Sequence, residues 1–297
     1  MGNSAGATPS SPVEGWFTTE GLNLRFVEWG SGERPAIVML HGLRSYAHTW
    51  EPVALPLSHR WRVIALDQRG RGRSDWNPQG DYYTEAYVRD LEALVDHLSL
   101  RRFVLVGHSM GGANAFVYAS RHPERVAALA VEDMGPGASA SSGGADRIRR
   151  ELNETPSSFA NWSDAVAFWR SIRPDISAEA LQSRVTHSLK LGGDGRVTWC
   201  HDAVGIARAR LSAAPEKIVD LWPHVEALQM PTLLIRGANS DFLSAATAEE
   251  MCRRNARIGR TDVPGATHYV HDDNLAGFNA VLQDFLARLA GSSTSWS

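Results

Sequence analysis

The strongest chemical signal in the sequence is the segment FVLVGHSMGG, residues 103–112. It contains the pattern Gly-x-Ser-x-Gly, in which Gly107 and Gly111 lie two residues to either side of Ser109. An apolar run precedes the serine and a helical pattern follows it, which predicts a tight strand-to-helix turn. Such a turn leaves no room for side chains at the flanking positions and presents the hydroxyl at a helix N-terminus that favours negative charge. The pattern therefore predicts a nucleophilic serine.

A serine hydroxyl is a poor nucleophile near pH 7 and needs a base. Among the 11 histidines, His268 follows the last strand-like run and precedes the last helical pattern. That position is the carboxyl edge of an open α/β sheet, where functional sites form. His271 has no better context, and His108 is too constrained by the turn beside the serine. We therefore expect His268 to take the proton of Ser109.

Two aspartates could orient this histidine. Asp133 closely follows the apolar run Ala127–Val131, and Asp241 follows the run Thr232–Arg236. Both are expected at the carboxyl edge of their strands, where either could hold the imidazole tautomer and stabilise the imidazolium. Position along the chain leaves both aspartates as candidates.

Acyl transfer also needs donors for a developing oxyanion. The apolar run Ala36–Leu40 leads into a loop in which the backbone N–H of Leu43 could converge with that of Met110. Gly42 is expected to shape this loop, and Arg44 lies near the same mouth, where it could meet an anionic substrate.

The elements that must position these residues alternate along the chain. Short apolar runs, several of them continuous, alternate with helical patterns, which indicates βαβ units and a mainly parallel sheet covered on both faces. The predicted strands are Leu24–Trp29, Ala36–Leu40, Arg62–Leu66, Phe103–Gly107, Ala127–Val131, Thr232–Arg236 and Ile258–Val263, and the predicted helices are Tyr83–Ser99, Met110–Arg121, Ala245–Arg257 and Asn274–Ala290.

One region interrupts this alternation. It opens on a Gly/Ser-rich stretch, shows no clear strand, and carries several aromatic residues on helical patterns. We interpret it as a helical cap inserted into the α/β core, with Trp162 and Trp169 among the residues expected to line a pocket beneath it. The predicted organisation is a core formed by residues 13–134 and 229–291, a cap formed by residues 135–228, and flexible tails at residues 1–12 and 292–297.

Composition limits the classes of partner. The 297 residues are 43% hydrophobic and 21% charged with a net charge of −3, which excludes global disorder and gives no basic field for nucleic acid or an anionic membrane. Cys200 and Cys252 are far apart, which excludes a disulfide scaffold and a cysteine-rich zinc site, and no metal is expected. There is no long apolar run and no signal-peptide pattern, so we expect a cytoplasmic monomer or homodimer away from membranes.

The stretch Asp67–Asp75, DQRGRGRSD, resembles a phosphate-binding loop at first sight. Its glycine spacing fits neither the P-loop nor the dinucleotide-binding pattern. We therefore expect a structural turn held by arginine–carboxylate pairs.

Five motifs together resemble the α/β-hydrolase superfamily, in its small, cap-bearing serine hydrolase and esterase branch. They are HGLRSYAHTW, DQRGRGRSD, GHSMGG, RGANSDFLS and PGATHYVHDD, which occur in family order over residues 20–290. The resemblance implies an α/β-hydrolase fold with an inserted helical cap. It also implies that Ser109 is the nucleophile, His268 the base, and Leu43 and Met110 the oxyanion donors.

The sequence departs from the commonest family pattern at the acid. The pattern Gly-x-x-Asp after the late strand would place the acid three residues beyond Gly237, but that residue is Ser240 and Asp241 is one further. A one-residue shift in an extended segment turns the side chain to the opposite face. Some relatives resemble this chain in having a serine here and the acid after the preceding strand. The resemblance thus favours Asp133, helped by Ser240, and Asp241 remains the alternative.

The implied function is a cofactor-free serine hydrolase that cleaves a carboxylic ester, thioester, lactone or amide of a small molecule through an acyl-enzyme. Alternatives on the same scaffold are a C–C bond hydrolase, a perhydrolase, a cofactor-free oxygenase, and a non-catalytic ligand-binding protein. Family members include hydrolases of acidic amides, so arginines in the cap region are candidates for holding an acidic substrate. These arginines are Arg147, Arg149, Arg150, Arg170 and Arg173.

Overall fold

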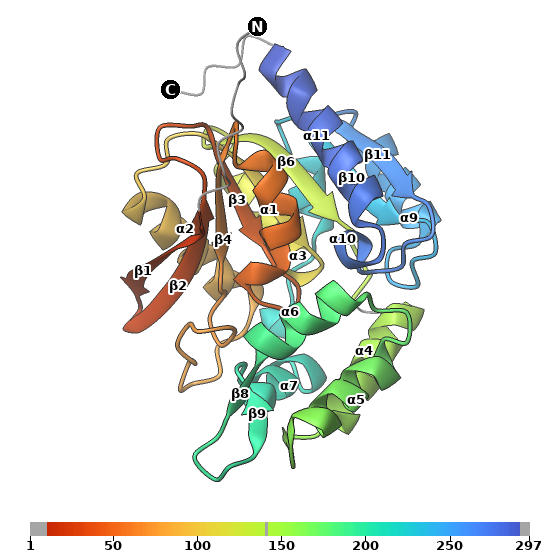
Figure 1. The fold of residues 1–297 in the computed structure, drawn as a ribbon. Helices are drawn as coiled ribbons and strands as arrows, with labels where there is room; N and C mark the ends of the chain where they lie inside the picture. The colour runs from red at the N-terminus through yellow and green to blue at the C-terminus, as the bar shows by residue number, and fades with distance from the viewer. Residues whose placement is uncertain (1–10, 140–141, 292–297) are drawn as a thin grey trace, which may run out of the picture.

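The centre of the protein is an eight-stranded sheet (Figure 1). The computed structural model describes residues 11–139 and 142–291, so the predicted tails lie outside the described residues, apart from residues 11 and 12. The strand order is β1-β2-β4-β3-β5-β6-β10-β11. The strands are β1 (Val13–Thr19), β2 (Leu22–Trp29), β3 (Ala36–Leu40), β4 (Arg62–Leu66), β5 (Phe103–His108), β6 (Val126–Glu132), β10 (Thr232–Gly237) and β11 (Ile258–Val263).

The sheet is parallel from β4 to β11, and β2 is antiparallel to both β1 and β4. Its central strands are apolar on both faces, as burial under two helical layers requires. In β5, Phe103 and Leu105 pack into one apolar cluster, while Val104 and Val106 pack into the other. This alternation follows from the two-residue period of a strand.

Helices cover the two faces of the sheet. One face packs against α2 (Thr84–His97), α3 (Met110–Arg121), α8 (Trp222–Glu226) and α9 (Ala245–Arg254). The other packs against the 3-10 turn η1 (Ala47–Trp50), α1 (Glu51–Leu57), α10 (Val270–Asp273) and α11 (Leu275–Gly291). This arrangement confirms the predicted α/β class. Among the described residues, no helix has the length and apolar character that crossing a bilayer requires.

All seven predicted strands are present with ends displaced by at most two residues, and all four predicted helices are present. The sequence analysis missed β1, which is mostly exposed and contains Gly15, and α1, which contains Pro52 and Pro56. Both elements lack the local signal that their structure normally requires. They form because β1 pairs along its whole length with β2 and because α1 buries Val53, Ala54 and Leu57.

The segment between β6 and β10 gathers at one end of the main sheet, as the green and teal ribbons of Figure 1 show. It begins with α4 (Gly143–Glu154), β7 (Ser158–Phe159), α5 (Trp162–Ile172) and α6 (Ala178–Ser188). It continues with β8 (Leu189–Leu191), β9 (Val197–Trp199), α7 (Ala203–Leu211) and a 3-10 turn η2 (Pro215–Lys217).

The expectation of a purely helical cap is wrong in one respect. The strands β7, β9 and β8 form a separate antiparallel sheet, and each is only two or three residues long. Runs this short show no two-residue period in the sequence. The region has its own apolar cluster around Phe159, Trp169 and Trp199. Near its end, Leu221, Val225 and Leu228 pack instead into the apolar cluster of the main sheet.

The predicted structural turn after β4 is confirmed. The buried Asp67 accepts a hydrogen bond from Arg25 at 2.7 Å, and Arg69 binds the carboxylate of Asp90 through two contacts of 2.6 Å. A second arginine of this turn, Arg71, is also fully buried, but its guanidinium donates to the backbone carbonyls of Leu43 and Arg69 rather than to an acid.

Candidate active site

Ser109 stands on a strained turn between β5 and α3, with a φ of 53° and a ψ of −117°. The steric reason given for its two glycines holds. A Cβ on Gly107 would lie 2.4 Å from the carbonyl oxygen of Gly111, and a Cβ on Gly111 would lie 2.3 Å from that of Leu40. Because neither position accepts a side chain, the turn can hold the serine hydroxyl at the edge of the sheet.

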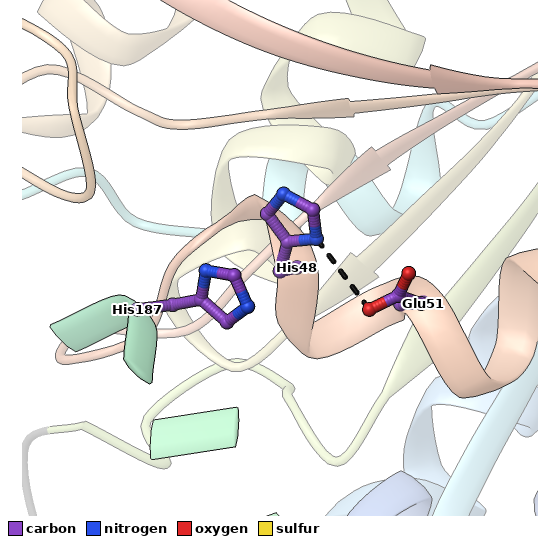
Figure 2. Close-up of side chains that lie close together, drawn as sticks. All are labelled: His48, Glu51 and His187. Carbon is purple, nitrogen blue, oxygen red and sulfur yellow. Dashed lines mark ion pairs between the residues drawn. The ribbon is translucent and has the colours of Figure 1, made fainter. Parts of the chain in front are cut away.

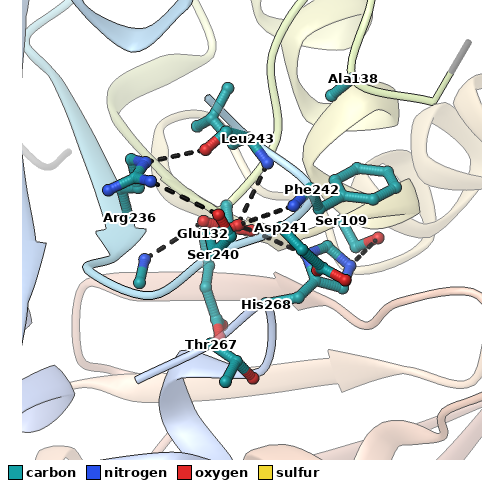
Figure 3. A network of polar contacts seen from close by, with 12 residues as sticks. Ser109, Glu132, Ala138, Arg236, Ser240, Asp241, Phe242, Leu243, Thr267 and His268 are labelled. Atoms are coloured by element: carbon teal, nitrogen blue, oxygen red, sulfur yellow. Dashed lines mark hydrogen bonds and ion pairs between the residues drawn. The ribbon is translucent and has the colours of Figure 1, made fainter. Parts of the chain in front are cut away.

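Three side chains form a continuous hydrogen-bonded chain. Nε2 of His268 lies 2.9 Å from the Oγ of Ser109 (Figure 3). Nδ1 of His268 lies 2.8 Å from Oδ2 of Asp133. All three residues are at least 95% buried. The carboxylate can only accept at Nδ1, so the imidazole carries its proton there and leaves the Nε2 lone pair for the serine hydroxyl.

Asp133 follows β6 directly and has a φ of 49°. Its Oδ1 accepts the N–H of Gly237 at 3.1 Å, and its Oδ2 accepts the hydroxyl of Ser240 at 2.6 Å. The Ser240 oxygen in turn accepts the N–H groups of Phe242 and Leu243, each at 3.1 Å. Ser240 therefore fixes the carboxylate that holds the histidine, in the place where the commoner pattern has the acid itself.

The structure does not bring the alternative acid to the imidazole. Both carboxylate oxygens of Asp241 accept hydrogen bonds from Arg147 on α4, at 2.9 and 3.0 Å. The Arg147 guanidinium also holds the pKa of Asp241 below its usual value. Asp241 is therefore a link between the core and α4 rather than a partner of His268.

The backbone N–H groups of Leu43 and Met110 donate no hydrogen bond among the described residues. Met110 is the first residue of α3, where an N–H has no partner within the helix. Arg71 spans the two residues, since its Nε donates to the carbonyl oxygen of Leu43 at 3.0 Å and its Nη2 contacts the Met110 sulfur at 3.5 Å. Both N–H groups are thus available to an oxyanion beside Ser109.

Ser109 lies where two cavities meet. The first, towards His268 and Tyr269, is lined by Gly42, Leu43, Arg44, Ser45, His108, Ser109, Ile148, Glu151, Trp169, Ile172, Arg173, Arg184, His268, Tyr269 and His271. The second, of about 330 Å³, is lined mainly by apolar residues and includes Met110. His268 lines only the first cavity, and Met110 lines only the second.

Three of the five residues expected at the substrate site line the first cavity: Gly42, Arg44 and Trp169. Ser240 lines neither cavity, and its hydroxyl donates to Asp133 instead. The expectation for Trp162 is wrong, because its side chain is 42% exposed at the start of α5 and lines neither cavity. In α5 the two tryptophans are seven residues apart. Trp162 lies in the exposed first turn of the helix, while Trp169 packs in the apolar cluster of the inserted region.

The arginines of the first cavity are paired with carboxylates of the protein. Arg44 binds Glu151, Arg173 binds Asp272 at 3.2 Å and Asp273 at 2.8 Å, and Arg184 binds Asp272. Each pair joins the core to the inserted region. The guanidinium groups of Arg184 and Arg173 hold the pKa of Asp272 far below its usual value, although burial would raise it. These charges are balanced within the protein.

The five arginines that were candidates for holding an acidic substrate are either paired with carboxylates of the protein or exposed. Arg147, Arg149 and Arg173 are bound to carboxylates, and Arg150 and Arg170 are exposed. The sequence shows the positive charges of the region but not the acids that fold against them, because several of those acids are distant in the chain.

A second histidine–carboxylate pair lies beside the first and was not predicted. Nδ1 of His271 is 2.8 Å from Glu132, and its Nε2 is 3.0 Å from the hydroxyl of Thr49. Although burial alone would lower it, the Glu132 carboxylate raises the pKa of His271. Since both ring nitrogens are engaged, His271 is not placed to act as the base for Ser109. The signal in the sequence that could have revealed this pair is the occurrence of two adjacent acids, Glu132 and Asp133.

Within the part of the chain that the structure describes, two groups of side chains have the spacing of metal ligands. In the buried group, His108, Glu132 and His271, the ring of His271 is already hydrogen-bonded through both nitrogens. In the other, His48 and Glu51 of the core meet His187 of α6 (Figure 2). The rings of His48 and His187 stack at 4.1 Å with planes 9° apart, so their in-plane lone pairs run parallel instead of converging on one ion. The stack is best described as a contact between core and cap.

Burial lowers the pKa of His187 to about 4, helped by the neighbouring His48. In the unfolded chain this histidine returns to its ordinary value near 6.5. Between about pH 6.5 and 4 the unfolded state therefore binds a proton at this histidine that the folded state does not bind. The contribution of this group to the free energy of unfolding is complete above this pH range and is lost as pH falls through it. Similar depressions to about 3 or 4 apply to His41, His108 and His201.

We expect the free energy of unfolding to fall between pH 7 and pH 5, and to fall less in His187→Gln because one of these groups is removed. Urea titrations at both pH values measure the difference. His59→Gln is the matched control, since His59 is exposed. An equal loss in wild type and His187→Gln would contradict the assignment.

A mostly parallel eight-stranded sheet, a strained serine turn after a central strand, and a histidine carried behind the last strand define a hydrolase of the α/β type. Comparison with known families agrees. The model of the alpha/beta hydrolase fold family matches residues 35–275, and the chain belongs to this family.

Several of the similar proteins are named as hydrolases. The chain is 30% identical over 251 residues to the 2-(acetamidomethylene)succinate hydrolase of Mesorhizobium japonicum, covering 84% of this chain and 86% of that protein. It is 28% identical over 279 residues to the N-formylmaleamate deformylase of Pseudomonas putida, covering 92% and 96%. It is 28% identical over 255 residues to an esterase of Mycobacterium tuberculosis, covering 83% and 80%.

Solved structures give the same result. The crystal structure of an E-2-(acetamidomethylene)succinate hydrolase superposes with a TM-score of 0.83 at 26% identity, covering 93% of this chain and all of that chain. An α/β hydrolase from Novosphingobium aromaticivorans superposes with a TM-score of 0.80 at 31% identity, covering 93% and 98%. The chain is therefore a hydrolase with the α/β-hydrolase fold.

Proposed function

We propose that the protein is a serine hydrolase that cleaves a small carboxylic ester, thioester, lactone or amide through an acyl-enzyme. The observation that carries this proposal is the unbroken chain from Ser109 Oγ to His268 Nε2, at 2.9 Å, and from His268 Nδ1 to Asp133, at 2.8 Å. These contacts are within the range that proton transfer from a nucleophile to its base requires.

In the proposed reaction, Ser109 attacks the acyl carbonyl while His268 takes its proton. The N–H groups of Leu43 and Met110 stabilise the tetrahedral oxyanion, and each such donor is typically worth about 3 kcal/mol. Asp133 holds the imidazole in the productive tautomer and stabilises the imidazolium. His268 then protonates the leaving group, and a water molecule activated by the same imidazole releases the acyl group.

The two cavities suggest how the substrate is divided. The leaving group must depart next to the imidazole that protonates it, and His268 lines only the first cavity. The oxyanion must face the N–H of Met110, which lines only the second. We therefore place the leaving group in the first cavity, and the acyl chain in the second, whose lining residues are mainly apolar.

The substrate range includes acidic compounds. Two relatives are named for derivatives of succinate and maleamate, both of which carry carboxyl groups. The esterase among the relatives keeps simple esters in the range as well. Proposed partners are thus limited to a small acyl substrate.

Labelling with a p-nitrophenyl alkylphosphonate tests the proposal. We expect release of one equivalent of p-nitrophenol per chain, loss of esterase activity, and a mass increase confined to the peptide that contains Ser109. Labelling of another residue would contradict the assignment of the nucleophile. Absence of labelling and of ester turnover, or oxygen consumption with an aromatic substrate, would favour a ligand-binding protein or a cofactor-free oxygenase.

A further inference from the structure

The second cavity is lined mainly by apolar residues, but it also carries positive charge. Among its described lining residues there is no aspartate or glutamate, whereas there are three cations: Arg149, Arg210 and Lys217. The first cavity differs, since its arginines are bound to carboxylates of the protein. The uncompensated positive charge therefore lies on the side of Ser109 where the acyl chain is proposed to bind.

Of these three cations, Arg210 is the unusual one. Arg149 binds Asp146 at 2.5 Å, and Lys217 is exposed with its Nζ 5.6 Å from the centre of the Tyr83 ring. Arg210 lies at the end of α7, is half-buried, and forms no ion pair with a carboxylate among the described residues.

The charged and titratable groups that face Arg210 are Tyr83, Tyr87 and Arg71. Burial lowers the pKa of Arg210, and the second guanidinium, on Arg71, acts in the same direction. Arg71 itself is fully buried and donates to carbonyl and hydroxyl oxygens rather than to a carboxylate. Arg210 thus lines a mainly apolar cavity without a carboxylate partner among the described residues, and the positive charge of Arg71 adds an unfavourable interaction.

Keeping a cation out of water without a partner is unfavourable, and a nearby like charge adds to that cost. A carboxylate arriving with the substrate would remove both penalties. Guanidinium is also the group best suited to bind a carboxylate, through two parallel hydrogen bonds. The walls between Ser109 and Arg210 are apolar and include Met134, Ile148, Leu152, Val219, Leu221 and Phe242.

We propose that Arg210 binds a carboxylate at the far end of the substrate's acyl chain. The preferred substrates are then monoesters, monothioesters or monoamides of a dicarboxylic acid whose two carboxyl groups are separated by an apolar stretch. This inference rests on the proposed serine hydrolase function and names its substrate class. It places the acidic group in a cavity that also includes Arg149, one of the five arginines considered from the sequence, whereas the other four do not line this cavity.

The test compares two substrates of equal length, p-nitrophenyl hexanoate and mono-p-nitrophenyl adipate, with the pimelate and suberate monoesters extending the series. For each enzyme, the ratio of kcat/KM for the carboxylate ester to that for the neutral ester is measured. We expect the wild type to have a higher kcat/KM for an ester with a free terminal carboxylate than for the neutral ester. Arg210→Met should lower this ratio about 10- to 100-fold, as for the loss of a charged hydrogen-bonded pair. Arg210→Lys should recover part of the preference.

Arg208→Met is the matched control. Arg208 lies on the same helix, is exposed, and does not line the cavity, so its loss removes the same charge but should leave the ratio unchanged. In the wild type, 0.5 M NaCl should lower kcat/KM for the carboxylate ester more than for the neutral one, a readout that does not depend on the folding of a variant.

The possible results distinguish a failure of the carboxylate site from a failure of the proposed hydrolase function. If neutral esters are hydrolysed at Ser109 but Arg210→Met leaves the ratio unchanged at every chain length, the carboxylate site is wrong and the hydrolase stands. If the wild type hydrolyses neither kind of ester and takes no phosphonate label, both are wrong. An equal loss of the ratio in Arg208→Met would reduce the effect to general surface charge and would also overturn the site.

Discussion

Replacing Ser109 with alanine is expected to lower kcat for the best ester substrate by a factor on the order of 10⁶, to the rate that binding and the oxyanion donors alone sustain. The substitution removes the only atom proposed to bond to the acyl carbon. It leaves His268 in place, since the imidazole is still held by Asp133 at 2.8 Å and packs against Phe242. Steady-state rates with a p-nitrophenyl ester measure the effect.

The fold should tolerate this change. Among the described residues the Ser109 hydroxyl has one hydrogen-bond partner, His268, so its removal is worth about 1 kcal/mol. The melting temperature should therefore stay within roughly 4 °C of wild type. Turnover above about a tenth of the wild-type rate in a folded Ser109→Ala protein would show that another group attacks the substrate.

The second large effect concerns the acid. Asp133→Asn is expected to lower kcat about 10⁴-fold, because an amide favours the wrong imidazole tautomer and cannot balance the charge of the imidazolium. The pair of variants Asp133→Asn and Asp241→Asn makes the comparison direct, since the chemical change is the same at two positions that the sequence could not separate.

Asp241→Asn should change kcat by less than about threefold. Its carboxylate is 42% exposed and binds Arg147, and an exposed pair of this kind contributes about 0–1 kcal/mol. Rates for both variants, measured at one pH near 7 with folding checked by circular dichroism, decide between the acids. If Asp241→Asn lowered kcat as much as Asp133→Asn, the assignment of Asp133 as the acid that orients His268 would be contradicted.

The succession of strands and helices along the chain, the turn at Ser109 and the position of His268 follow from local patterns in the sequence. Glycine spacing and continuous apolar runs are set by neighbours in the chain, so β5, α3 and the other core elements were predicted to within a few residues. The small sheet β7-β9-β8 was missed because its strands depend on pairing between segments that are each too short to show a period.

The choice between the two acids depends on where a backbone turns, and the sequence alone leaves that open. Asp133 reaches His268 because its φ of 49° takes the chain out of the strand conformation immediately after β6. The charge balance of the cavities is likewise a property of the fold. Arg173 and Arg210 look alike in the sequence, yet one meets Asp272 and Asp273 while the other meets no carboxylate among the described residues.

Two adjacent residues, Ser240 and Asp241, connect the catalytic acid to helix α4. The Ser240 hydroxyl donates to the carboxylate of Asp133, and Asp241 forms an ion pair with Arg147 on α4. An outward movement of α4 must either break this ion pair or displace the segment that holds the carboxylate of Asp133. Because the exposed Asp241–Arg147 pair contributes little free energy, an outward movement of α4 would break this pair before it displaced the carboxylate of Asp133.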